Sequence, residues 1–266
     1  MTITMKTTMQ ADPRASATRA PAVSIRGLRF GWTRKDVLRG VDLDVQVGEI
    51  MALVGANGVG KSTLLSLLCG AEPYRPFWRR PKDVRVNVLG LDPVKNGHEL
   101  RSLIGYVPDR TELPKWMKIR DHFRLVKALH PRWDDAEAAR FLERFGLEGS
   151  MRYADLSKGQ RMLENVTAAL AVRPPLLLLD EPFSGLDPVA RRLVTEGLIE
   201  HMCEHDASVL LVSHSIADVE RCADRVALFA DGRVAEVATV DELRGRSEHG
   251  DLEDALVAVA RDGRAA

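Results

Sequence analysis

The segment from residue 55 to residue 63 constrains the fold and the chemistry of this chain more than any other part. It reads Gly-Ala-Asn-Gly-Val-Gly-Lys-Ser-Thr and fits the pattern G-x-x-x-x-G-K-[ST], whose glycines let successive backbone N–H groups turn toward one anion. The apolar run before it, residues 50–54, is typical of a buried parallel strand, and residues 61–69 after it predict a helix that ends at Gly70. A strand, a glycine loop and a helix start in this order predict an α/β fold with a polyphosphate site.

The chemistry of the loop suggests how it would hold a polyphosphate. Lys61 is expected to reach the β- and γ-phosphates, and the hydroxyl of Ser62 is expected to ligate the Mg²⁺ that neutralises them. Thr63 either contacts the α-phosphate or only begins the helix. The residues assigned to phosphate binding are Gly55, Asn57, Gly58, Gly60, Lys61, Ser62 and Thr63. The loop alone does not separate a kinase, a GTPase, a helicase or a transporter motor.

Charge and cysteine content narrow the class of partner and compartment. Lysine plus arginine balance aspartate plus glutamate, 38 against 38, so no basic excess points to nucleic acid or to an anionic membrane surface. Cys69, Cys203 and Cys222 lack the spacing of metal ligands, and we predict free thiols in a reducing compartment, the cytoplasm by default. No stretch approaches the length needed to cross a bilayer, so another polypeptide would have to hold the chain at a membrane.

The N-terminal part of the chain predicts a leader followed by antiparallel strands. Residues 1–22 lack the apolar core of a signal peptide, and we expect a disordered leader. Residues 23–30, 41–47 and 84–88 alternate apolar with polar side chains, as half-buried strands do. Between the first two strands lie Phe30 and Trp32, which either stack on an adenine ring or fill the sheet. The basic, proline-broken run at residues 74–82 is interpreted as a surface loop, with nucleic-acid binding as the alternative.

A helical insertion is expected at about residues 107–172, beginning at the end of the segment 104–109. Asp134 followed by Glu137 predicts a capping box at the start of an amphipathic helix. The insertion is either a lever or docking surface, or a purely structural cap. Near its end, Ser157 and Gln160 predict a second capping box. This segment is either an ordinary helix start or, with the N–H groups around Gly159, an anion-binding one.

Two buried strands are expected to carry chemistry at their ends. Residues 176–179 are four leucines followed by Asp180 and Glu181, and adjacent carboxylates at a buried strand are costly unless a cation meets them. We predict that Asp180 supports Mg²⁺ and that Glu181 activates the attacking water as general base. Residues 209–213 predict a strand that brings His214 to the same edge, to bind the γ-phosphate or simply to face solvent. A β-hairpin around residues 231–232 and a short polar helix close the chain.

Taken in order, these motifs resemble those of the ATP-binding cassette ATPases, the motor subunits of ABC transporters. The glycine loop, LSKGQ at residues 156–160, LLLLDEP at 176–182, SGLD at 184–187 and His214 carry the resemblance, which covers about residues 23–240. LSKGQ is the diagnostic piece because P-loop kinases and GTPases lack it. Residues 104–109, 113–116 and 180–187 look most like stand-alone bacterial cassettes that serve separately encoded exporter-type membrane subunits.

The resemblance implies an architecture and an assembly. The fold would be a P-loop NTPase α/β core with an N-terminal antiparallel β subdomain and an inserted α-helical subdomain at residues 23–240, then a short helical tail at 241–266. ATP and Mg²⁺ would lie between the glycine loop of one copy and the Ser157–Gly159 helix start of another, in a head-to-tail dimer. The dimer would drive an integral membrane permease from the inner face of the cell membrane.

The resemblance also implies roles for individual residues. Glu181 would be the general base, His214 the γ-phosphate sensor and Asp180 the magnesium aspartate. Across the dimer, ATP would be contacted by Ser157, Gly159 and Gln160, and Asp187 would be part of the dimer contact. Trp32 would be the aromatic that stacks on adenine, with Phe30 as the alternative. Two positions depart from the family pattern. Asp109 replaces the usual glutamine and could hold a magnesium-bound water, although the neutral amide contact is lost. Lys158 replaces the second glycine of the signature and either attracts phosphate or faces solvent.

Two other functions remain open at this point. One is an ABC-type ATPase acting on DNA or ribosomes, which the balanced charge and the lack of long coiled coils disfavour. The other is a regulatory module that holds ATP without turnover, which Glu181 and His214 disfavour and Asp109 favours. Cargo, direction of transport and the identity of the membrane subunit lie outside the sequence, because specificity would reside in the partner.

Overall fold

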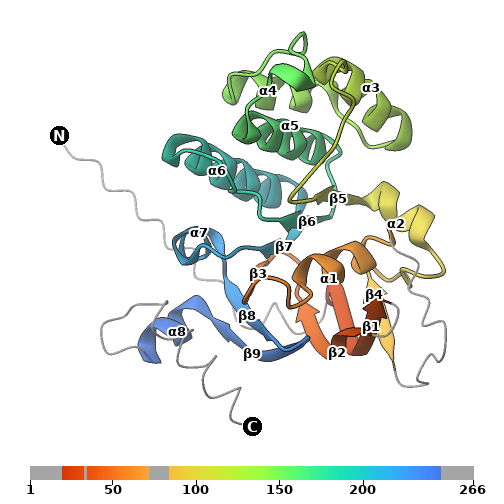
Figure 1. The fold of residues 1–266 in the computed structure, drawn as a ribbon, viewed down its shortest axis with the longest axis vertical. Helices are drawn as coiled ribbons and strands as arrows, with labels where there is room; N and C mark the ends of the chain where they lie inside the picture. Colours follow the sequence, from red (N-terminus) through yellow and green to blue (C-terminus); the bar gives the residue numbers. More distant parts are fainter. Residues whose placement is uncertain (1–19, 33–34, 72–83, 247–266) are drawn as a thin grey trace.

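Two β-sheets form the framework of the chain in this computed structural model, which describes residues 20–32, 35–71 and 84–246. In the six-stranded sheet the first five strands in spatial order run parallel, and the last pairs antiparallel with its neighbour (Figure 1). The spatial order is β5 (Ile104–Val107), β6 (Leu176–Asp180), β7 (Ser208–Val212), β3 (Ile50–Val54), β8 (Arg225–Ala230) and β9 (Arg233–Thr239).

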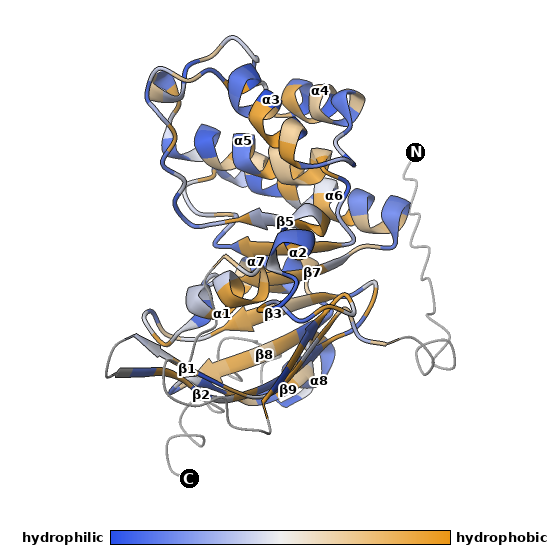
Figure 2. Ribbon diagram, turned by 90° about the vertical axis from the view of Figure 1, so that its right-hand side faces the viewer, coloured by the Kyte–Doolittle hydropathy of each residue, from blue (hydrophilic) through white to orange (hydrophobic). Residues whose placement is uncertain are grey.

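The central strands are mostly apolar because helices and a second sheet cover both faces. Every residue of β3, β6 and β7 is buried, as parallel sheets covered on both faces require. Alternate residues of β6 enter different cores: Leu177 and Leu179 pack with the helical insertion, whereas Leu176 and Leu178 pack with α1 (Lys61–Leu68). Figure 2 shows these strands as largely hydrophobic and the helices as hydrophilic on their exposed faces. The remaining helices outside the insertion are α2 (Gly97–Leu103), α6 (Pro188–His205), α7 (Ile216–Cys222) and α8 (Val240–Arg246).

The smaller sheet is antiparallel, in the order β2 (Lys35–Val45), β1 (Val23–Trp32) and β4 (Arg85–Val88). The prediction that its second strand begins at residue 41 is wrong, because β2 begins at Lys35, whose backbone pairs with Trp32. Irregular pairing between β1 and β2, with Gly40 at φ 110°, hides the alternation from the sequence. Phe30 and Trp32 therefore lie within the paired end of β1 rather than between two strands.

A hairpin joins the two sheets. Asp231 and Gly232 both have positive φ, 47° and 76°, as expected for the predicted two-residue turn between β8 and β9. The N–H of Arg39 in β2 donates to the carbonyl of Gly232 at 2.8 Å. A Cβ at residue 232 would lie 2.3 Å from the carbonyl oxygen of Val37, so only glycine permits this approach. The antiparallel sheet is thus fixed against the six-stranded sheet by backbone contact.

The helical insertion contains α3 (Ile119–Leu129), α4 (Asp135–Arg144), a short 3₁₀ turn (Tyr153–Asp155) and α5 (Lys158–Ala171). The capping box predicted for α4 is only half correct. Asp134 accepts from the N–H groups of Ala136 and Glu137, but its own N–H donates to the carbonyl of Ala171. The side chain of Glu137 binds Arg140 instead of returning to Asp134. The start of α4 is therefore tied to the end of α5.

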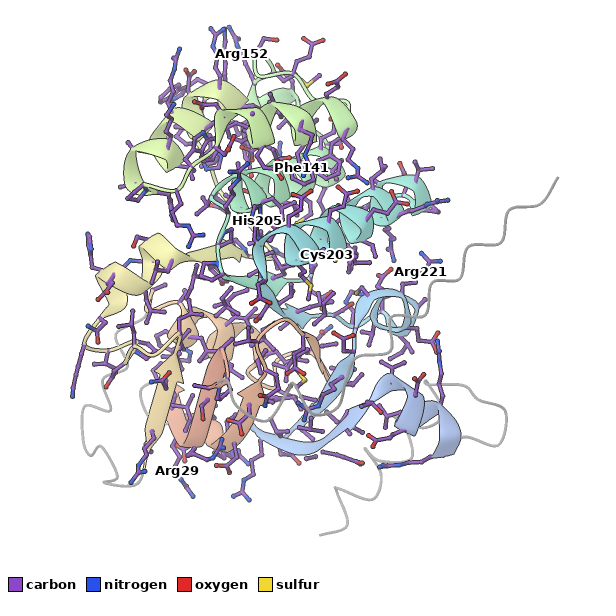
Figure 3. The ribbon with its side chains drawn as sticks, turned by 180° about the vertical axis from the view of Figure 1, so that it is seen from behind. Arg29, Phe141, Arg152, Cys203, His205 and Arg221 are labelled. Atoms are coloured by element: carbon purple, nitrogen blue, oxygen red, sulfur yellow. The ribbon has the colours of Figure 1, made fainter. Side chains whose placement is uncertain are left out.

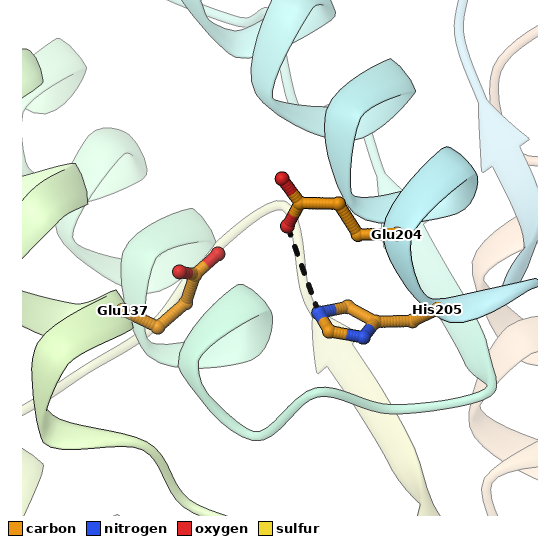
Figure 4. Close-up of side chains that lie close together, drawn as sticks. All are labelled: Glu137, Glu204 and His205. Carbon is orange, nitrogen blue, oxygen red and sulfur yellow. Dashed lines mark ion pairs between the residues drawn. The ribbon is translucent and has the colours of Figure 1, made fainter.

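An ion-pair network fixes the insertion to α6. Arg140 donates to both carboxylate oxygens of Glu137, at 2.5 and 3.1 Å, and lies 3.3 Å from Glu200. Glu137, Glu204 and His205 converge between the two helices, with one nitrogen or oxygen of each within 4.8 Å of the others (Figure 4). Arg140 lies 3.8 Å from Glu204 as well, so the guanidinium supplies the positive charge of this cluster. Because these pairs are partly exposed, they orient the helices more than they stabilise them.

The cysteines are free thiols, as predicted. Cys69 and Cys222 are buried and Cys203 is exposed on α6 (Figure 3). Burial raises the pKa of the Cys222 thiol to about 12. Within the described residues we find no helix that is both long enough and apolar enough to cross a membrane.

Some predictions fall at the limits of the described residues. The leader and the tail lie mainly at residues 1–19 and 247–266, and the basic run lies at 74–82; all three segments are outside the described residues. Ala22, the last residue of the predicted leader, is buried directly before β1, and its carbonyl accepts from the N–H of Leu89, so it belongs to the folded part of the chain.

Candidate functional site

The candidate site lies at the carboxyl ends of β3, β6 and β7, where the parallel strands deliver the motifs to one edge of the sheet (Figure 1). A cavity of about 360 Å³ opens there, and nearly all of the predicted phosphate, magnesium and base residues line it. The lining residues are Trp32, Val37, Asn57, Gly58, Gly60, Lys61, Ser62, Thr63, Asp109, Asp180, Glu181 and Val212. Trp32 and Val212, which are 180 positions apart in the sequence, therefore line the same cavity.

The glycines of the loop are required for two different reasons. Gly58 and Gly60 have φ of 78° and 113°, in the region that side chains disfavour. Gly55 has an ordinary φ, but a Cβ there would lie 2.1 Å from the carbonyl oxygen of Phe229 in β8. No side chain caps the first turn of α1, so its unpaired N–H groups remain available to an anion.

Lys61 is held over the loop that precedes it. Its ammonium group donates to the carbonyls of Gly55 and Ala56, at 2.8 and 2.9 Å. Burial lowers the pKa of Lys61, while the carboxylates of Glu181 and Asp180 oppose this shift. A buried cation above a loop of N–H donors gives the cavity the charge that a polyphosphate needs.

Asp180 and Ser62 form an oxygen donor set that fits Mg²⁺. Asp180 is 3% exposed, and burial raises the pKa of its carboxyl group, with the hydroxyl of Ser62 donating to it. Its Oδ1 atom is buried without a hydrogen-bond partner. Asp109, predicted as a further magnesium contact, adds repulsion to Asp180 and lies 3.7 Å from Arg110. An unsatisfied buried carboxylate oxygen beside a hydroxyl is the arrangement that a hard cation completes.

Asp180→Asn is expected to stabilise the metal-free chain at neutral pH. Because burial raises the pKa of Asp180, keeping it ionised costs folding free energy above that pKa, and the cost disappears as pH falls through it. The neutral amide removes the cost, so we expect the Tm to rise by about 2–4 °C near neutral pH, equivalent to ~1 kcal/mol for a chain of this size. Thermal melts from neutral pH down to about pH 4 should show the gain shrinking; a gain independent of pH would contradict the assignment.

Glu181 and His214 contact each other, which the sequence did not predict. The Glu181 carboxylate lies 2.7 Å from Nδ1 of His214, whose side chain is 63% exposed. Glu181 has φ 54°, and its N–H donates to the carbonyl of Val212 at 2.9 Å. A non-glycine residue held in this region is costly and is found where the surroundings impose it, often at active sites. The predicted base is therefore fixed through both its backbone and its carboxylate.

The second predicted anion site, at the start of α5, does not line the glycine-loop cavity of its own chain in the described residues. Its capping box is confirmed: Ser157 Oγ accepts from the N–H of Gln160 at 3.1 Å, and Gln160 Oε1 accepts from the N–H of Ser157 at 3.0 Å. The Gln160 amide oxygen is thus used by the cap. The hydroxyl proton of Ser157 and the free N–H groups of Lys158 and Gly159 remain for an anion.

Other residues have roles that the sequence analysis missed or left open. Val37 and Val212 line the cavity; the sequence pattern missed Val37 because β2 begins at Lys35 and not at residue 41. Asp187 accepts from the N–H of Ala190 at 2.8 Å and caps α6, while its role in a dimer contact stays a prediction. Lys158 is exposed, and its ammonium group donates to the hydroxyl of Ser184 at 2.8 Å; its attraction for the phosphate of a second copy stays a prediction.

Comparisons with known proteins agree with this geometry. The family model of the ABC transporter matches residues 38–184. The aliphatic sulfonates import ATP-binding protein SsuB of Pseudomonas putida is 35% identical over 86% of this chain and 80% of its own length. The ABC transporter ATP-binding protein YtrB of Bacillus subtilis is 27% identical over 84% of this chain and 73% of its own length.

Solved structures give the same result. An ATP-binding subunit of an ABC transporter superposes with a TM-score of 0.78 at 28% identity, covering 90% of this chain and 99% of that one. A dimeric ATP-binding cassette in a post-hydrolysis state, bound to ADP and Pi, has a TM-score of 0.70 at 21% identity, covering 82% of this chain and 98% of that one, and supports the fold alone. The P-loop α/β architecture is confirmed. This chain belongs to the ABC transporter family, as one of its ATP-binding, ATP-hydrolysing subunits.

Proposed function

We propose that this subunit binds MgATP in the glycine-loop cavity, dimerises around it and uses its hydrolysis to drive a membrane permease. The observation that carries the proposal is the convergence of Lys61, Ser62, Asp180 and Glu181 on one cavity at the ends of two parallel strands. Phosphate binding, metal support and a proton acceptor are the parts that P-loop phosphoryl transfer needs.

Trp32 is the proposed adenine-stacking residue. It is 49% exposed and lines the cavity, whereas Phe30 packs edge-to-face against it, with ring centroids 5.0 Å apart. Stacking of a base on an aromatic side chain is worth about 1–3 kcal/mol, so Trp32→Ala is expected to weaken ATP binding about 5- to 150-fold. Phe30→Ala should have a smaller effect; a larger loss in Phe30→Ala, measured by calorimetry, would reverse the assignment.

The proposed hydrolytic step is an in-line displacement at the γ-phosphorus. Glu181 accepts a proton from the attacking water while the water oxygen bonds to phosphorus and the β–γ bridging oxygen leaves with ADP. Lys61 neutralises charge on the phosphates. His214 orients the Glu181 carboxylate through Nδ1, which leaves Nε2 to hydrogen-bond the γ-phosphate. Mg²⁺, when bound, would be held by Ser62 and Asp180, with Asp109 on a bound water, and would stabilise the charge that develops on the transferred group.

The start of α5 supports a head-to-tail dimer. Its anion-binding groups are Ser157 and the free N–H groups of Lys158 and Gly159, which do not line the cavity of their own chain in the described residues. A second copy would bring a glycine-loop cavity to them, so that each ATP completes its binding site across the interface. In such a dimer, Asp187 at the start of α6 would lie at the interface.

The helical insertion is the proposed docking surface for an integral membrane permease. It exposes large apolar side chains, with Trp116, Leu125 and Leu129 between 51% and 71% exposed. The subunit would then lie on the cytoplasmic face of the cell membrane, held by the permease. The Pseudomonas putida relative is an import protein by name, and an exporter-type partner for this chain stays a prediction.

Affinity purification tests the transporter assignment. A tagged Glu181→Gln chain, gently solubilised from membranes with ATP, is expected to bring down a multi-spanning protein in stoichiometric amount. Identification of that protein by mass spectrometry would also supply the subunit from which cargo can be sought. If only the tagged chain, ribosomes or DNA were recovered, the ATPase chemistry would stand and the transport assignment would fall.

A further inference from the structure

Lys158, the residue that departs from the family signature, connects the start of α5 to the turn that follows Glu181. Its ammonium group donates to the hydroxyl of Ser184 at 2.8 Å. Lys158 is the first residue of α5 and is exposed, whereas Ser184 is half-buried in the turn between β6 and α6. The contact is made within one chain.

The two backbones meet at glycines on both sides of this contact. A Cβ at Gly159 would lie 2.7 Å from the carbonyl oxygen of Gly185. Gly185 has φ 77°, and a Cβ there would lie 3.2–3.6 Å from the side-chain carbons of Lys158. The start of α5 therefore lies directly on the turn, and the methylene groups of Lys158 cover Gly185.

The turn connects Lys158 to Glu181 through the backbone. The N–H of Ser184 donates to the carbonyl of Glu181 at 3.0 Å, so Ser184 is bonded to Glu181 on one side and to Lys158 on the other. Glu181 is held at φ 54° with its carboxylate on His214. A shift of Ser184 would move the carbonyl of Glu181 and thereby the direction of its side chain.

Lys158 also borders the segment that carries Asp109. Lys158, Asp109, Arg110 and Arg161 line one cavity of about 320 Å³, and Asp109 lines the glycine-loop cavity as well. The lysine therefore stands where α5, the Glu181 turn and the Asp109 segment meet.

We propose that Lys158 is a positioning residue for Glu181, which holds the catalytic turn to the start of α5 in the same chain. The inference rests on the proposed role of Glu181 as general base. When the start of α5 contacts ATP held in the cavity of a second copy, the same contact would fix the turn that carries Glu181 in the chain to which this α5 belongs. The hydrogen bond between Lys158 and Ser184 would thereby link anion binding at the start of α5 to water activation by Glu181.

A double-mutant cycle with steady-state ATPase kinetics tests the proposal. Lys158→Met removes the donor but keeps the methylenes over Gly185, and Ser184→Ala removes the acceptor. Each single variant is expected to lower kcat about three- to tenfold with the KM for ATP unchanged, as loss of one exposed hydrogen bond allows. The double variant should be no worse than either single one, because both remove the same bond. Lys158→Arg, which keeps a donor, should recover most of the rate.

Each other outcome contradicts the inference. Multiplicative losses in the double variant would mean that the two side chains act independently, and a raised KM in Lys158→Met alone would indicate a direct phosphate contact. Wild-type kcat in both single variants would leave the contact without a catalytic role. A wild-type chain that neither binds nor hydrolyses ATP would overturn the proposed function, whereas an active wild type with unaffected variants would overturn this inference alone. Thermal melts on each variant check that the fold is retained.

Discussion

Replacing Glu181 with glutamine is expected to lower ATP turnover by about 10²- to 10⁴-fold while leaving ATP binding intact. Glutamine has nearly the same shape and can still accept a hydrogen bond from His214, but it cannot take a proton from water. The loss corresponds to ~3–5 kcal/mol of transition-state stabilisation. Because hydrolysis stops after binding, an ATP-bound dimer should accumulate, which size-exclusion chromatography with light scattering would detect.

Glu99→Gln is the matched control for that variant. Glu99 is exposed on α2 and does not line the cavity. Its replacement by glutamine is therefore the same chemical change made away from the site. This variant should turn over ATP at the wild-type rate. Unimpaired turnover in Glu181→Gln would exclude Glu181 as the general base and would leave a water activated by the phosphate itself as the explanation.

Replacing Lys61 with alanine is expected to weaken ATP binding by about 10- to 150-fold, because charge-assisted hydrogen bonds contribute about 1.5–3 kcal/mol each. The ammonium group is already desolvated and held by two carbonyls at the loop, so little ordering remains to be done when phosphate arrives. Isothermal titration calorimetry with ATP measures the loss directly and does not depend on turnover.

Lys95→Ala controls for the removal of a positive charge, since Lys95 is exposed and lies outside the residues that line the cavity. Its ATP affinity should match that of the wild type. Equal affinities of the Lys61→Ala variant and the wild type would show that the loop N–H groups suffice and would remove Lys61 from the site. A parallel loss of Tm would instead point to disruption of the loop itself.

Much of the site was predictable because its signals are local in the sequence. The glycine loop requires positive φ and close approach at fixed spacing, and the leucine run ending in Asp180 marks a strand buried on both faces. Parallel strands bring their carboxyl ends to one edge of a sheet, so the sequence predicted that Glu181 and His214 share that edge, but not that they contact each other. The capping box at Ser157 was predictable for the same reason, since both partners lie within one turn.

The features that were missed depend on contacts between distant segments. The backbone N–H of Asp134 is taken by Ala171, so the local capping pattern at Glu137 could not form in full. The bond between Lys158 and Ser184 joins residues whose side chains face each other only after α5 packs on the turn. The irregular pairing of β1 with β2 concealed the first residues of β2. Tertiary packing decided each of these cases, and no periodicity in the sequence reports it.

The different exposure of the three cysteines makes the unmodified chain suitable for site-specific labelling. Cys203 is exposed on α6, while Cys69 and Cys222 are buried, and the raised pKa keeps the Cys222 thiol protonated and unreactive at neutral pH. A maleimide dye should therefore attach at Cys203 without any substitution. Energy transfer between donor and acceptor dyes on two copies would then follow their approach and separation through each round of ATP binding and release.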